Sequence, residues 1–95
     1  MVKSIIQSER ECFITGSTTM LHEHHIFGGT GTRQLSDQYG LTVYLRFDWH
    51  NGEKYGVHFN KDLDLRLKRI AQKKAMEHYG WTTEEFIKIF GRNFL

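Results

Sequence analysis

The sequence has no proline, one cysteine and no apolar run that approaches the roughly 20 residues of a membrane-spanning helix. The lone Cys12 excludes an intramolecular disulfide and an all-cysteine zinc cluster, and it fits a reducing compartment. No repeat, low-complexity segment or proline-rich stretch marks a linker. We therefore expect one soluble, cytoplasmic domain over residues 1–95, without a membrane segment.

The excess of one charge sign is also small, because 13 Lys and Arg residues and 11 Asp and Glu residues give a net charge of +2. The basic residues are unevenly placed, because residues 66–74 contain no acid and five bases: Arg66, Lys68, Arg69, Lys73 and Lys74. Such a run is typical of a nucleic-acid-binding surface and equally of an ordinary solvated helix face. Charge alone leaves both interpretations open.

Two segments have the pattern of strands. Residues 41–50, "LTVYLRFDWH", alternate between apolar and polar positions and predict a half-buried strand. Residues 20–27, "MLHEHHIF", predict a shorter strand with His22 and His24 on one face and with Glu23 and His25 on the other. The glycine-rich residues 28–40 between them predict a long exposed loop.

Two helices are predicted after the turn "HNGEKYG". Asn60 is a suitable N-cap and Gly80 a suitable stop for a long basic helix. A capping box from Thr82 to Glu85 opens a shorter helix that ends at Gly91. The expected buried stripe of the long helix comprises Leu63, Leu67, Ile70 and Ala71. The order of strand, loop, strand, turn and two helices predicts an α+β fold.

Five of the six histidines fall between residues 22 and 58. Neutral imidazoles are good ligands for borderline divalent metals, and a further imidazole can serve as a general base. Because neighbours on a strand point to opposite faces, His24 could coordinate an ion while His25 activates a water molecule.

Each histidine also has a purely structural interpretation. His22 has no obvious partner and is expected to be solvated, and His78 fits a packed residue or a partner of the helix dipole. His50 and His58 are eight residues apart, and the intervening Asn51-Gly52 pair could form a plain hairpin turn. The residues alone therefore leave a metal site and a set of structural histidines both open.

Five blocks of the chain occur in an informative order: "LHEHHIFGG", "RQLSDQYGLTVYL", "DWHN", "YGVHFNKDLDLRLK" and "EEFIKIFGRNFL". These blocks resemble, in the same order, those of the HNH nucleases of the ββα-metal fold, and specifically the small HNH proteins of phages and prophages in Gram-positive bacteria. More distantly, the chain is similar to the RecA-dependent nuclease associated with recombination enhancement in a temperate phage. The resemblance implies a ββα-metal core with a long basic helix and a short C-terminal helix.

The resemblance also implies roles for individual residues. His25 matches the general base, and the metal ligands correspond to His24, His50 and His58. Arg33 and Ser36, in the expected loop, match polar residues that face the substrate or brace the loop. On the basic helix, the residues expected to hold DNA phosphates are Arg66, Lys68, Arg69 and Lys73.

The implied activity is metal-dependent hydrolysis of DNA phosphodiester bonds. One divalent ion, drawn from zinc, nickel, cobalt, manganese or magnesium, would stabilise developing charge, and magnesium suits imidazole ligands least. The implied setting is the cytoplasm of a bacterial host, and a homodimer or a recombination or packaging complex is the implied assembly.

The chain departs from the family pattern at two places. Cys12 stands alone where relatives carry zinc-binding cysteine knuckles, with Thr15 and Arg46 at other knuckle positions, so no structural zinc is expected. The middle asparagine of the HNH pattern is replaced near Gly40 and Leu41. These departures favour an alternative, a catalytically degenerate module that binds nucleic acid or a phage or host protein without cleavage.

Overall fold

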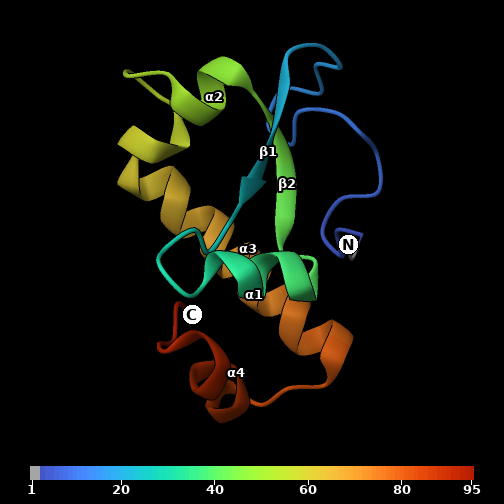
Figure 1. The fold of residues 1–95 in the computed structure, drawn as a ribbon, viewed down its shortest axis with the longest axis vertical. Coiled ribbons are helices and arrows are strands. Elements are labelled where there is room, and N and C mark those ends of the chain that lie inside the picture. Colours follow the sequence, from blue (N-terminus) through green and yellow to red (C-terminus); the bar gives the residue numbers. More distant parts are fainter. Residues whose placement is uncertain (1–2) are drawn as a thin grey trace.

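Two short antiparallel strands lie at the centre of the structure, a computed structural model that describes residues 3–95 (Figure 1). The predicted domain of residues 1–95 therefore includes Met1 and Val2, which lie outside the described residues. The predicted α+β class is confirmed. In chain order the elements are β1 (Leu21–His25), α1 (Arg33–Tyr39), β2 (Thr42–Arg46), α2 (Phe47–Asn51), the 3-10 turn η1 (Val57–Phe59), α3 (Lys61–Tyr79) and α4 (Thr83–Phe90).

Strands β1 and β2 pair in the register that places His24 opposite Val43 and His25 opposite Thr42. The predicted apolar face of β2 is confirmed, because Val43 and Leu45 are buried. The prediction of a strand through residue 50 is wrong, since the chain turns into α2 at Phe47. A local ion pair between Arg46 and Asp48 holds this turn, and no alternation of apolar residues reveals such a pair.

The segment between the strands is not the predicted long loop, because residues 33–39 form α1. Gly40 ends this helix with φ of 72° and donates its N–H to the carbonyl of Ser36. A side chain at Gly40 would also meet the carbonyl oxygen of Lys3, because a Cβ atom there would lie 2.5 Å away. The helix thus ends where only glycine fits, and it brings residues 33–39 beside the end of β1.

The caps of the two C-terminal helices are as predicted. The side chain of Asn60 accepts from Leu63 N–H at the start of α3, and Gly80 ends that helix with φ of 69°. Thr82 and Glu85 form the capping box of α4, and Gly91 follows its last residue. Both helices therefore begin and end where short-range sequence signals place them.

The buried stripe of α3 is only partly as predicted. Leu67 and Ala71 are buried, but Ile70 is 37% exposed and Gln72 is fully buried. Gln72 is buried because the C-terminal tail crosses α3: its amide donates to Asn93 Oδ1 at 2.7 Å and accepts from Phe94 N–H at 2.7 Å. A satisfied amide therefore takes a core position.

The core lies between the strand pair, α3 and α4. Phe86 and Phe90 of α4 stack on each other and contact Phe27 just after β1. Among residues 3–95, no helix is both long enough and apolar enough to cross a membrane.

Candidate metal centre and the adjacent histidine

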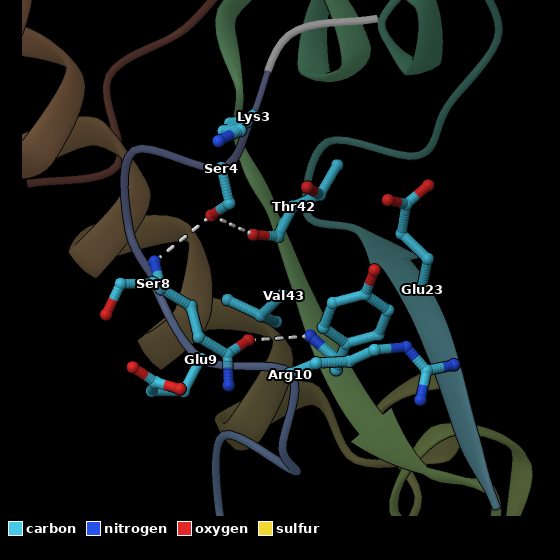
Figure 2. Close-up of a pocket in the computed structure, with 10 residues that line it drawn as sticks. Lys3, Ser4, Ser8, Glu9, Arg10, Glu23, Thr42 and Val43 are labelled. Atoms are coloured by element: carbon cyan, nitrogen blue, oxygen red, sulfur yellow. Dashed lines mark hydrogen bonds between the residues drawn. The ribbon is translucent and has the colours of Figure 1, made fainter.

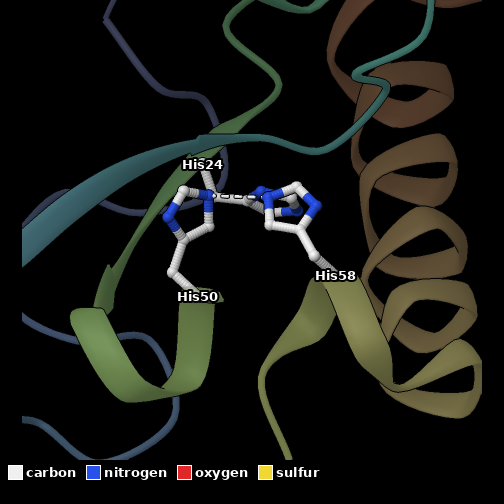
Figure 3. Close-up of side chains that lie close together, drawn as sticks. All are labelled: His24, His50 and His58. Carbon is white, nitrogen blue, oxygen red and sulfur yellow. Dashed lines mark hydrogen bonds between the residues drawn. The ribbon is translucent and has the colours of Figure 1, made fainter. Parts of the chain in front are cut away.

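Three histidines from three elements meet beside the strand pair (Figure 3). His24 comes from β1, His50 from α2 and His58 from η1. One side-chain nitrogen from each lies within 4.8 Å of the other two, and Nε2 of His50 lies 3.0 Å from Nε2 of His58. The sequence separates these residues widely, and the fold brings together the three that the resemblance implied as ligands.

His50 is fixed by a polar clamp on α2. Arg46 donates from Nε and from Nη2 to the carboxylate of Asp48, each at 2.6 Å, and Tyr55 donates its hydroxyl to Asp48 at 2.5 Å. These donors hold the pKa of Asp48 well below its ordinary value. The clamp fixes the turn from β2 into α2 and thereby the position of His50.

Two glycines allow the chain to return from α2 to η1. Gly52 N–H donates to the carbonyl of Asp48 at 3.0 Å, and Gly56 N–H donates to the carbonyl of Gly52 at 2.8 Å. A Cβ atom at Gly56 would lie 2.5 Å from backbone atoms of Gly52. The Asn51-Gly52 pair is therefore not a strand-to-strand hairpin; it belongs to a tight return that sets His58 against His50.

Two of the three imidazoles, those of His24 and His50, are held in the neutral form. Burial, followed by the neighbouring His50 and His58, lowers the pKa of His24 to about 3. Burial and the adjacent His58 and His22 lower the pKa of His50 to about 4. A neutral imidazole has a free nitrogen lone pair, which is the form that binds a metal ion.

One atom of the cluster lacks a partner. His24 is 3% exposed, and its Nε2 is buried without a hydrogen-bond partner among residues 3–95. A buried polar atom without a partner is costly, and a metal ion would satisfy it. The donor set fits a borderline divalent ion, so this group of three histidines could hold one.

His25 has different neighbours on the other face of β1. Its Nε2 lies 3.6 Å from Asp37 Oδ1 and 3.8 Å from Glu23 Oε1. Asp37 comes from α1, so the helix that replaced the predicted loop supplies one of the two carboxylates. Both distances exceed a hydrogen bond, so neither carboxylate is hydrogen-bonded to Nε2.

The two histidine environments open onto shared space. A cavity of about 150 Å³ is lined by Arg33, Glu23 and Gly28 together with His24, His25, His50 and His58. A second hollow of about 210 Å³ touches His24, His25 and His58 and reaches Asp64 and Lys68 of α3. A small substrate group in this space would meet both the imidazole cluster and His25.

A larger cavity lies elsewhere. It measures about 490 Å³ and lies between the N-terminal segment and the outer side of β2, where Lys3, Ser4, Arg10 and Thr42 line it (Figure 2). Some of its polar groups bond to one another: Ser4 donates to the Thr42 carbonyl at 2.6 Å, and Gln7 accepts from Tyr44 N–H at 2.8 Å. No histidine lines it, so the smaller cavities are the better candidates for chemistry.

The expected nucleic-acid contacts divide into groups. Arg33 and Lys68 line the cavities beside the histidines, with Lys68 Nζ 2.8 Å from Asp64. Ser36 is fully buried and bonds through its hydroxyl to both backbone groups of Phe27, so it braces the fold rather than facing a substrate. The other three bases lie on α3 outside these two cavities: Arg66, Arg69 and Lys73. Arg69 donates to the Phe94 carbonyl at 3.1 Å.

The sequence did not reveal two residues that contact the histidines of the candidate site, His22 and Asp37. His22, expected to lack a partner, places Nδ1 3.0 Å from Nδ1 of His50. The two-residue period of the strand could have indicated this contact, because it places His22 on the same face of β1 as His24. Asp37 was hidden because α1 was not predicted, although Gly40 is a typical residue just beyond a helix end.

The comparisons of this chain with protein-family models, with curated proteins and with solved structures found no match.

Proposed function

We propose that the chain is a metal-dependent nuclease with the ββα-metal arrangement of the HNH family, formed by β1, β2 and α3. The observation that carries the proposal is the convergence of His24, His50 and His58, with a buried and unpartnered Nε2 on His24, directly beside His25. Buried polar side-chain atoms are rarely left without a partner, so this nitrogen supports a bound ion at the cluster.

The chain's own residues divide the work of hydrolysis. His24, His50 and His58 would hold the ion, and His25 would accept a proton at Nε2 from the attacking water. Glu23 and Asp37 stabilise the positive charge that His25 then carries, because their carboxylates lie 3.8 and 3.6 Å away. A bound divalent ion would supply Lewis-acid stabilisation of the phosphate and of the leaving oxygen.

Phosphate binding falls to the bases that line the cavities. Arg33 at the start of α1 and Lys68 on α3 reach the shared space from two elements. Arg66 and Lys73 are exposed on α3 and extend the positive surface. Contacts of this kind are salt-dependent and largely independent of base sequence, so DNA is the proposed substrate without a proposed recognition sequence.

The test is nicking of supercoiled plasmid by protein that was first stripped of metal with EDTA. Wild-type protein should nick the plasmid when Mn²⁺, Co²⁺, Ni²⁺, Zn²⁺ or Mg²⁺ is restored, with Mg²⁺ the weakest. His25→Ala should lower the rate about 10²–10⁴-fold, the usual contribution of a general base. Calorimetric titration with Zn²⁺ should show nearly unchanged affinity in this variant.

Two results would contradict the proposal in different ways. Loss of metal binding in His25→Ala would make His25 a ligand rather than the base. Intact metal and DNA binding without nicking by any of the five ions would favour the degenerate binding module instead. His78→Ala is the matched control, since His78 is an exposed histidine at the far end of α3.

A further inference from the structure

We propose that His22 is a positioning residue of the metal centre, which accepts a hydrogen bond from Nδ1 of His50 and so keeps Nε2 of His50 free to bind the ion. This inference rests on the proposed function, because it assigns a role beside the same three histidines. It gives a task to the histidine that the sequence left without a partner.

Both nitrogens of His50 have an imidazole neighbour. Nδ1 lies 3.0 Å from Nδ1 of His22, and Nε2 lies 3.0 Å from Nε2 of His58. A neutral imidazole carries one proton, so His50 donates at one of these contacts and accepts at the other. Only the form with the proton on Nδ1 leaves a lone pair on Nε2, the nitrogen that faces the cluster.

A third group favours one direction for the hydrogen bond between His22 and His50. The side-chain nitrogen of Asn51 lies 3.5 Å from the same Nδ1 of His22. An amide nitrogen can only donate, so Nδ1 of His22 is the acceptor in this contact. This contact favours a lone pair on Nδ1 of His22 and a proton on Nδ1 of His50, which is the form that His50 requires as a ligand.

The geometry also separates His22 from the ligands themselves. The group of nitrogens within 4.8 Å of one another belongs to His24, His50 and His58, whereas His22 contacts the opposite side of the His50 ring. The rings of His22 and His50 meet edge to face, with centroids 5.2 Å apart and planes at 83°. Since His22 and His24 share one face of β1, a single strand supplies a ligand and the residue that orients another ligand.

The test compares side chains that can and cannot accept at position 22. Zn²⁺ and Co²⁺ affinities are measured by calorimetry for wild type, His22→Leu, His22→Ala and His22→Glu, with His78→Ala as the control. Leu and Ala offer no acceptor, so their dissociation constants should rise about 10–100-fold, as is typical when an outer partner of a ligand is lost. Glu offers a carboxylate acceptor and should bind close to wild type.

A second measurement follows the proton itself. Long-range proton–nitrogen NMR of the metal-free protein should place the proton of His50 on Nδ1 in wild type and in His22→Glu. In His22→Leu that signal should move to Nε2. A residue that merely stabilised β1 would change the melting temperature without moving this proton.

The outcomes separate this inference from the function on which it rests. Unchanged affinity in both His22→Leu and His22→Ala would overturn the role of His22 and leave the metal centre intact. Equal loss in His22→Glu and His22→Leu would overturn the acceptor role. Failure of wild-type protein to bind Zn²⁺ or Co²⁺ would overturn the metal centre itself, and with it the role of His22.

Discussion

The two faces of β1 give neighbouring histidines opposite surroundings. His24 is buried among other imidazoles, whereas His25 is half-buried between the carboxylates of Glu23 and Asp37. The first environment penalises a positive charge, whereas the second places two carboxylates 3.6 and 3.8 Å from Nε2 of His25. Consecutive residues of β1 therefore have opposite electrostatic surroundings.

The largest expected effect comes from removing a ligand on the imidazole face. His58→Ala should raise the dissociation constant for Zn²⁺ at least a hundredfold, because even outer partners of ligands contribute about 10–100-fold. His58 is exposed on η1, so the melting temperature of the metal-free protein should change little. Calorimetric titration against the His78→Ala control measures the loss, and an undiminished affinity would remove His58 from the ligand set.

A second prediction concerns the loss of folding stability at low pH and tests only the face of β1 that carries His24. His24 has a pKa of about 3 in the folded chain, against an ordinary value of 6.5, so the unfolded chain binds more protons between these values. Stability is therefore fully present above about pH 6.5 and falls as the pH is lowered, by at most about 1.4 kcal/mol per pH unit for this one group.

Urea unfolding in EDTA at pH 7 and pH 5 measures this effect. His24→Gln should show a weaker dependence than wild type, and what remains should include His50, whose pKa is lowered to about 4. The His78→Ala control should retain the wild-type dependence. An identical dependence in His24→Gln and wild type would show that His24 is not held neutral by burial.

The smallest expected effect lies on the carboxylate face. Asp37→Asn removes a charge 3.6 Å from His25 Nε2, but the Asp37 side chain is 45% exposed, so solvent weakens the attraction. Plasmid nicking should slow about twofold to fivefold, in the range of an exposed ion pair. Zn²⁺ affinity should stay at the wild-type value, and a change in that affinity would contradict the separation of the two faces.

The sequence predicts those structural features that depend on residues close together in the chain. The caps at Asn60 and at Thr82 with Glu85 involve residues three positions apart, and the structure confirms them. The turn into α2 depends on side-chain contacts of Asp48 with Arg46 and Tyr55, and the apolar alternation of residues 41–50 gave no sign of them. The pattern of apolar residues therefore predicted strand where side-chain hydrogen bonds impose a helix.

The site follows the same rule. His22 and His24 share a face because side chains two residues apart on a strand point the same way, and the sequence alone predicts this. The meeting of His24 with His50 requires the pairing of β1 with β2, and the meeting with His58 requires the return at Gly52 and Gly56. Residue spacing alone could not show these contacts, and it was the resemblance that named the histidines.

The hydrogen bonds that Arg46 and Tyr55 donate to Asp48 indicate whether His50 needs a bound ion to take its position. None of the members of this clamp, Arg46, Asp48 and Tyr55, belongs to the imidazole cluster, so α2 and His50 take their places through contacts that need no ion. In zinc fingers, by contrast, folding waits for the metal. If an ion binds there, a centre positioned by such contacts would exchange it without refolding, and the occupant would follow both the affinity of the imidazoles for each divalent metal and the free supply of that metal.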